Sequence, residues 1–154
     1  LLDLNALIRT TSGLMSYDKR MQKVNLQLDL DSQLPAIYGV ADQLTQVIMN
    51  LLINAADALE LVKDRALEIA VQTETLNGVV KLSVRDTGSG IDQDTLSRVF
   101  EAFFTTKRRG TGLGLALCYS IITGHDGTIE IDSTLGEGTR VLVTLPLPID
   151  EESI

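Results

Sequence analysis

The chain has 154 residues, of which 44% are hydrophobic and 22% charged, and its formal net charge is −8. This length suits one domain with a single core. The negative charge argues against nonspecific binding to nucleic acid, which needs a basic surface. It does not exclude a nucleotide, because Mg²⁺ and a few local cations can neutralise a triphosphate. We therefore expect one domain over 1–154, with tails at 1–3 and 148–154, and no nucleic-acid partner.

A single cysteine and a single histidine exclude an internal disulfide and argue against a zinc site. Cys118 lies in an apolar stretch, so we expect a buried apolar residue rather than a nucleophile. No apolar run approaches the ~20 residues of a membrane-spanning helix, and the first residues lack the basic leader of a signal peptide. The chain begins with Leu1 rather than Met, from which we expect a piece of a longer protein.

The first half of the chain predicts two helices and a strand. Residues 4–17 have the spacing of a short amphipathic helix. Residues 24–30 alternate apolar and polar side chains, as a half-buried strand does. Residues 42–60 carry the strongest helical pattern, with apolar side chains at the 3.6-residue period. Asp42 is the expected N-cap of this helix.

The second half predicts two hairpins separated by helices and a loop. Strands over 67–76 and 79–86 meet at Asn77-Gly78, the strongest short hairpin signal. The remaining segments are a short helix, a loop, a longer helix and a second hairpin, at 92–99, 100–112, 113–123, and 127–132 with 139–145. This order predicts an α+β fold: a two-layer α/β sandwich whose mixed, largely antiparallel sheet packs on three main helices.

Polar residues form a stripe on the predicted helix 42–60. Asp42, Gln46, Asn50 and Asn54 are four residues apart, and Asp57 follows three residues later, so all five share one face. One interpretation is that the amides bond to neighbouring backbone groups, as buried amides must. The other is that an amide oxygen is a ligand for Mg²⁺, which prefers oxygen donors.

A glycine-rich turn follows the strand that ends at Asp86, in the sequence Asp-Thr-Gly-Ser-Gly-Ile. Gly88 and Gly90 allow the backbone to approach a ligand closely and to adopt positive φ. Asp86 has apolar neighbours, and its carboxylate could accept a hydrogen bond from the amine of adenine. The alternative is a tight turn followed by a helix cap at Asp92.

Residues 100–109 (Phe-Glu-Ala-Phe-Phe-Thr-Thr-Lys-Arg-Arg) hold all three phenylalanines of the chain and end in three cations. They fit either a hydrophobic anchor with a solvated basic turn or a lid whose cation closes on phosphates. Gly110-Thr-Gly-Leu-Gly114 then leads into a helix, whose N-terminal amides suit a phosphate. Neither the dinucleotide fingerprint, which would need glycine at Leu115, nor the P-loop pattern is matched.

The combination of these four segments resembles the N, G1, F and G2 boxes of sensor histidine kinases. The matching segments are Gln46–Ala55, Asp86–Ile91, Phe100–Lys107 and Gly110–Leu117. The resemblance is to the catalytic, ATP-binding domain of these kinases, within the GHKL ATPase superfamily, and it spans roughly residues 3–147.

The resemblance implies ATP and Mg²⁺ as cofactors. Asn54 would coordinate Mg²⁺ with Asn50 beside it. Asp86 would bind the adenine amine, Ile91 would line the base pocket, and Thr139 would support it through water. The complete implied ATP site is Asn50, Asn54, Asp57, Asp86, Gly88, Gly90, Ile91, Phe104, Thr105, Thr106, Lys107, Gly110, Thr111, Gly112, Leu113, Gly114, Leu115 and Thr139.

The resemblance also implies a flexible ATP lid over about 100–112. In it Lys107 would reach the terminal phosphate, while Gly110, Gly112 and Gly114 would hinge the lid and offer amides. Phosphoryl transfer depends mainly on positioning and charge neutralisation, which these groups would supply. The two glycines at 110 and 112 predict mobility without nucleotide.

One motif departs from the family pattern: His-Gly-Gly is here His125-Asp126-Gly127. We expect His125 to be structural, at a helix-to-strand turn, because the family's phosphoacceptor lies in a separate dimerisation domain. The chain should therefore bind ATP without phosphorylating itself. The resemblance implies transfer to a histidine of that dimerisation domain, a response regulator downstream, and a homodimer only in the longer protein. It also implies a cytoplasmic location for this domain, without direct membrane contact. Whether the longer protein is attached to the inner membrane is left open by the resemblance.

Three alternatives remain open at this point. Hydrolytic GHKL ATPases have a pocket similar to this one but place a glutamate, as base for water, where Asn50 stands, and an amide cannot accept that proton. A nucleotide sensor without catalysis is disfavoured by the presence of Asn54, Asp86 and Lys107. An anti-sigma-type serine kinase would differ only in its partner.

Overall fold

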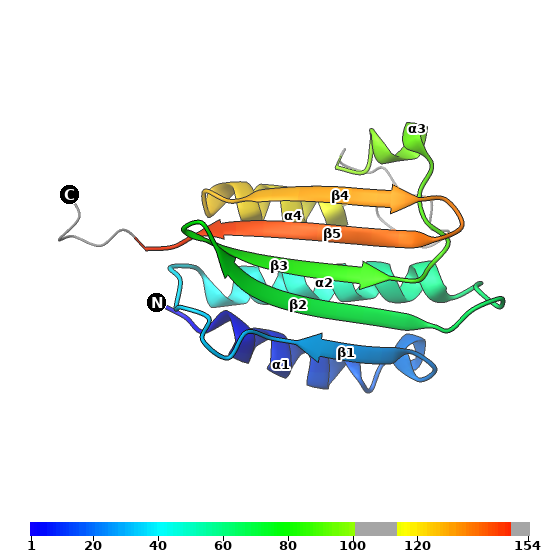
Figure 1. Cartoon of the computed structure of the whole chain (residues 1–154), viewed down its shortest axis with the longest axis horizontal. Helices are drawn as coiled ribbons and strands as arrows, with labels where there is room; N and C mark the ends of the chain where they lie inside the picture. Colours follow the sequence, from blue (N-terminus) through cyan, green and yellow to red (C-terminus); the bar gives the residue numbers. More distant parts are fainter. Residues whose placement is uncertain (101–113, 149–154) are drawn as a thin grey trace.

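The structure is a computed structural model that describes residues 1–100 and 114–148. It has two layers: a five-stranded sheet, and helices that cover one of its faces (Figure 1). Its elements are α1 (Leu4–Met15), η1 (Lys19–Met21), β1 (Asn25–Asp29), α2 (Ala41–Leu59), β2 (Glu68–Leu76), β3 (Val79–Asp86), α3 (Gln93–Leu96), α4 (Gly114–Gly124), β4 (Thr128–Thr134) and β5 (Gly138–Pro146). The predicted α+β sandwich is confirmed, and its three main helices are α1, α2 and α4.

The strand order is β1-β2-β3-β5-β4, with β1 parallel to β2 and the other pairs antiparallel. Local turn chemistry sets the β2–β3 hairpin, because Asn77 and Gly78 both have positive φ, at 51° and 79°. The crossover that places β5 beside β3 pairs Asp86, the last residue of β3, with Thr139 near the start of β5. The carboxylate predicted to hold adenine therefore lies at the end of two central strands.

The core lies between α2 and the inner face of the sheet. The buried side chains of α2 repeat at helical spacing and are Leu44, Val47, Ile48, Leu51, Leu52, Ala55, Ala56 and Leu59. Burying one such leucine or isoleucine contributes roughly 1.5–3 kcal/mol. Cys118 of α4 is fully buried, and burial raises the pKa of its thiol to about 11, as expected for an apolar residue rather than a nucleophile. This packing makes α2 a rigid base for the polar stripe.

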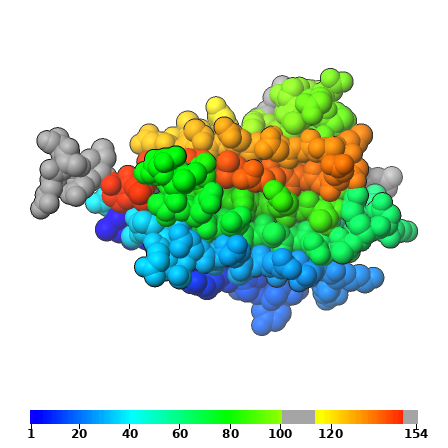
Figure 2. All heavy atoms as spheres, in the orientation of Figure 1, coloured from blue at the N-terminus to red at the C-terminus, as the bar shows by residue number. Residues whose placement is uncertain are grey.

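No helix of residues 1–100 or 114–148 covers the opposite face of the sheet, and its strands form successive bands in Figure 2. The inner residues of β3 are buried while the intervening ones are exposed or half-buried. This alternation is expected of an antiparallel sheet with one solvated face. Within the described residues, no helix is long and apolar enough to cross a membrane.

The predicted N-cap of α2 is wrong. The cap residue is Val40, which makes no side-chain cap bond, and Asp42 is an exposed residue of the first turn. The N–H of Val40 instead donates to Nε2 of His125, at 3.0 Å. A carboxylate in the first turn still stabilises the helix through its dipole. The residue pattern identified the helix but could not reveal this contact between residues 85 positions apart.

The predicted N-terminal tail also differs from the structure. Leu2 forms an antiparallel bridge with Ile37, with N–O distances of 2.8 and 3.1 Å. Asp3 is the N-cap of α1 and accepts a hydrogen bond from the N–H of Ala6 at 3.2 Å. Both residues are therefore held by specific contacts.

Candidate nucleotide-binding site

Asp86 is a buried carboxylate, only 7% exposed, at the end of β3. Burial raises the pKa of this carboxyl to about 6, although backbone N–H groups of Gly88 and Thr139 bond to it and lower the pKa. The N–H of Gly88 lies 2.8 Å from Oδ1. A carboxylate that is desolvated more than it is compensated is a strong acceptor for an additional N–H donor. An amine such as that of adenine would supply this donor.

The glycine turn after Asp86 is packed too closely for side chains. A Cβ at Gly88 would lie 2.7 Å from both the Cβ and the carbonyl oxygen of Ala58. Gly90 has a φ of 74°, and a Cβ there would collide with the backbone of Thr134. The N–H of Ser89 donates to the carbonyl of Ala58 at 3.1 Å. The turn is therefore fixed between the end of α2 and the β4–β5 hairpin.

Arg65, in the connection between α2 and β2, ties this turn together. Its Nε donates to the carbonyl of Thr87 at 2.8 Å and its NH2 to the carbonyl of Gly88 at 3.0 Å. Its NH1 donates to the carbonyl of Gly136 in the β4–β5 hairpin. Sequence reasoning missed Arg65, because an arginine between a helix and a strand carries no signal that distinguishes it from a solvated residue.

Ser133 of β4 joins the two residues implied to surround the base. Its Oγ accepts the N–H of Ile91 at 2.8 Å and lies 2.8 Å from Oγ1 of Thr139. Ser133 also donates to the carbonyl of Gly138 at 3.1 Å. The structure thus brings Ile91 and Thr139 together beside Asp86, through a serine that the sequence did not single out.

The polar stripe of α2 has two different halves. Asp42 and Gln46 are exposed, whereas Asn50, Asn54 and Asp57 are half-buried. The Cys118 thiol donates to the carbonyl of Val47 in α2, at 4.0 Å, and the side chain of Asn50 lowers the pKa of this thiol against the larger effect of burial. The bonding of Asn50 to neighbouring backbone groups stays a prediction.

A magnesium ion would find few protein ligands here. Among the described residues, no group of three or more His, Cys, Asp or Glu side chains could hold a metal ion. Asn54 and Asp57 offer an amide oxygen and a carboxylate on one face of α2. These hard-oxygen donors fit Mg²⁺, which keeps several waters and binds through one or two protein groups together with nucleotide phosphates.

A hollow of about 310 Å³ crosses the ends of β3, β4 and β5. Its lining includes Asp86, Ser133 and Thr139, but no residue of α2. Arg85, Asp132 and Arg140 of the solvated face also line it, so the hollow opens on the side of the sheet away from α2 and does not include the polar stripe.

Part of the predicted site lies outside the described residues: Phe104, Thr105, Thr106, Lys107, Gly110, Thr111, Gly112 and Leu113. The adjoining ends are described. Gly114 and Leu115 begin α4 and are half-buried. Phe100 packs on Tyr119 of α4, with ring centroids 5.4 Å apart. The first phenylalanine of the predicted anchor therefore contacts the helix that follows the second glycine cluster.

The fold and the buried carboxylate together define a class of protein: an α+β domain with a candidate nucleotide-binding site at the strand ends of a sheet that helices cover on one face. The chain belongs to the histidine kinase-, DNA gyrase B- and HSP90-like ATPase family, whose sequence profile matches residues 39–149. This confirms the resemblance drawn from the four motif segments.

Relatives of known type narrow the class further. The chain is 40% identical over 147 residues to the sensor histidine kinase ZraS of Escherichia coli O157:H7, covering 96% of this chain and 31% of that protein. It is 40% identical over 142 residues to sporulation kinase E of Bacillus subtilis (strain 168), covering 92% and 19% respectively. The chain thus spans about a third or less of these relatives.

Solved structures agree with this assignment. The catalytic domain of histidine kinase ThkA, in a nucleotide-free form, matches with a TM-score of 0.81 and 29% identity, covering 94% of this chain and 93% of that one. Full-length ShkA in complex with AMPPNP matches with a TM-score of 0.83 and 29% identity, covering 97% and 31%. The chain is a catalytic ATPase domain of the histidine kinase type.

Proposed function

We propose that this domain binds Mg-ATP and donates the γ-phosphoryl group to a histidine of a partner dimerisation domain in two-component signalling. The observation that carries the proposal is Asp86: a buried carboxylate, held by two N–H groups, beside a glycine turn in a histidine kinase-type fold. A buried acceptor at this position is suited to the directed N–H of an adenine amine.

The proposed roles follow the geometry of the site. Asp86 accepts the adenine amine, and Ile91 and Thr139 support the base through Ser133. Asn54 holds the metal ion, which would offset phosphate charge. Lys107 reaches the terminal phosphate, a role that rests on the sequence motif alone. Gly114 begins α4, whose N-terminal amides suit phosphate oxygens.

Asn50 supports phosphotransfer over hydrolysis. A water nucleophile needs a base that accepts its proton, and a neutral amide cannot. Asn50 lies on the half-buried part of the stripe, one turn before Asn54. We therefore propose that ATP is turned over only when a phosphoacceptor histidine is supplied.

The partners follow from the family. The two relatives, a sensor histidine kinase and a sporulation kinase, are three or more times as long as this chain, since it covers only 31% and 19% of them. We propose a dimerisation domain that carries the histidine, a response regulator that receives the phosphoryl group, and a cytoplasmic location where ATP is available. His125 is excluded as acceptor, because its two ring nitrogens are engaged by the backbone of Ile121 and Val40.

The test is transfer from γ-labelled ATP to the histidine-bearing dimerisation domain of the same protein, supplied as a separate chain. We expect protein-bound label that is labile in acid and stable in base, and only when both domains are present. Label on this domain alone, or stoichiometric release of free phosphate without protein label, would contradict the proposal. A dimerisation domain whose histidine is replaced by alanine is the control.

A further inference from the structure

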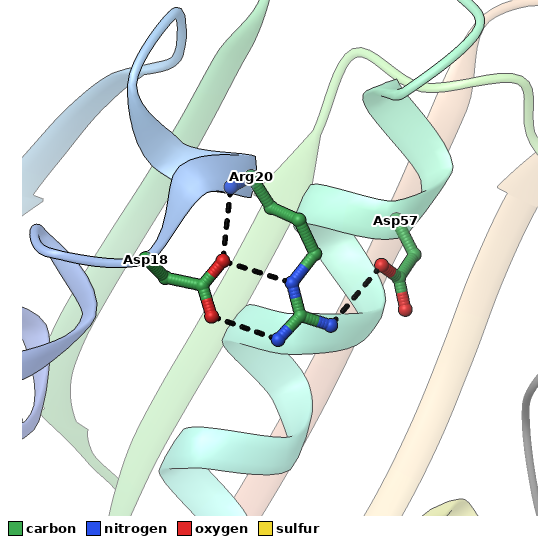
Figure 3. Close-up of polar contacts among 3 residues, drawn as sticks. All are labelled: Asp18, Arg20 and Asp57. Carbon is green, nitrogen blue, oxygen red and sulfur yellow. Dashed lines mark hydrogen bonds and ion pairs between the residues drawn. The ribbon is translucent and has the colours of Figure 1, made fainter.

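A three-residue charged cluster joins η1 to the end of α2 (Figure 3). Arg20 lies between Asp18, the N-cap of η1, and Asp57 of α2. Nε and NH2 of Arg20 donate to the two carboxylate oxygens of Asp18, at 3.0 and 2.8 Å. Its NH1 lies 3.4 Å from Oδ1 of Asp57. The guanidinium is therefore held in one orientation beside α2.

The cluster adjoins the proposed phosphate side of the site. Asp57 follows Asn54 by three residues, so the two side chains are neighbours on one face of α2. The next residue, Ala58, accepts the N–H of Ser89 and contacts Gly88 in the glycine turn. Arg20 is thus fixed beside the polar stripe in the last turn of α2, the turn of the helix that also contacts the glycine turn through Ala58.

The guanidinium of Arg20 has N–H groups available for an additional anion. Its contacts with Asp18 and Asp57 use three of its five N–H groups, and its side chain is 38% exposed. The same contacts keep Asp18 ionised, since hydrogen bonds from Arg20 lower the pKa of that carboxyl to about 2. Arg65, which contacts the glycine turn, already donates to three backbone carbonyls.

If Arg20 only linked η1 to α2, its contribution to the stability of the domain would be small. Solvent-exposed ion pairs contribute little to stability, because solvent screens them and two side chains must be immobilised. Such a tie would also affect every ligand of the site equally. A guanidinium that contacts phosphate would instead affect ligands according to their phosphates, because Arg pairs with phosphate oxygens through charge-assisted hydrogen bonds.

We propose that Arg20 is a phosphate-binding residue of this domain, which contacts the phosphates of the bound nucleotide, and that Asp18 and Asp57 are its positioning residues. The proposal rests on the function proposed above and adds a cation that lies outside all four motif segments. Arg20 precedes the region matched by the family profile, which begins at residue 39.

The test compares ATP and adenosine affinities in Arg20→Ala, Arg20→Lys and Lys19→Ala. Lys19 is the matched control, because it is an exposed cation of the same element and its removal changes the net charge equally. In Arg20→Ala we expect the Kd for ATP to rise about tenfold or more, the size of one lost charge-assisted hydrogen bond, with the Kd for adenosine unchanged. Arg20→Lys should fall in between, and Lys19→Ala should keep the wild-type ratio.

Equal changes in the two affinities of Arg20→Ala, or no change in either, would overturn the proposal. Circular dichroism checks that each variant is folded. If Arg20→Ala is unfolded, the ATP and adenosine affinities of Arg20→Lys are compared instead. Failure of the ATP proposal itself is distinguishable, because the wild-type domain would then bind neither ligand.

Discussion

At the scale of single residues, Asp86 combines a cost to stability with its proposed role in binding adenine. Its pKa of about 6 lies above the ordinary 3.8, and the cause is burial. The fold therefore favours the protonated form. Stability from this group is greatest below pH 4 and falls as the pH rises through 6, by up to roughly 3 kcal/mol. A ligand that donates an N–H to the carboxylate offsets this cost, so binding and ionisation are linked.

This linkage can be measured directly. We expect ¹³C NMR titration of the carboxyl carbon of Asp86 to give a pKa near 6 in the free domain. Adenosine should lower that pKa, because it binds the ionised form, and adenosine affinity should weaken below pH 6. The Asp86→Asn variant assigns the resonance by its loss. A pKa near 3.8, or one that adenosine leaves unmoved, would exclude this role for the carboxylate.

Asp126 illustrates what a single residue tells about the fold. It stands where the family motif often has glycine, and it adopts a left-handed φ of 59° in the turn before β4. Aspartate tolerates this conformation better than most side chains do. The sequence shows that this position departs from the motif. The left-handed backbone explains why the motif often has glycine there.

At the scale of elements, Arg65 connects segments that no local pattern relates. It joins the α2–β2 connection to the glycine turn and to the β4–β5 hairpin, across separations of 22, 23 and 71 residues. The hairpin at Asn77-Gly78 and the helix α2 could be predicted, because turn chemistry and periodicity are local. The positions of Arg65, Ser133 and Arg20 could not, since they depend on strand order and on long-range contacts.

Replacing Arg65 should loosen the adenine side of the site. In Arg65→Ala we expect stability to fall by about 1–3 kcal/mol, because three backbone carbonyls lose a charged donor. Adenosine affinity should fall with it, as the turn beside Asp86 loses its tie to the hairpin. Urea unfolding and calorimetric titration measure the two effects.

Lysine is the matched replacement at this position. It keeps the charge, but one ammonium lacks the planar fork that reaches three carbonyls, so we expect only partial recovery in Arg65→Lys. Full stability and full adenosine affinity in Arg65→Ala would show that the tie is dispensable.

At the scale of the whole molecule, the helices cover one face of the sheet and the proposed site lies at one end of the sandwich. The fold class, the main helices and the buried carboxylate were accessible from the sequence, because they follow periodicity and known motifs. Residues 104–107 and 110–113 of the predicted site lie outside the described residues, so their roles stay predictions. The fold adds the residues that hold the predicted site in place, namely Arg65 and Ser133.

The central claim is that Asp86 selects adenine for phosphoryl transfer, and calorimetric titration of the wild-type domain and Asp86→Asn with Mg-ATP and Mg-GTP at pH 8 tests it most directly. Adenine offers an amine where guanine offers a carbonyl oxygen, which a carboxylate repels. The account predicts ATP binding at least about a hundredfold tighter than GTP binding in the wild type, and a loss of most of that preference in the variant. Equal affinities for ATP and GTP, or an unchanged ATP affinity in Asp86→Asn, would contradict it.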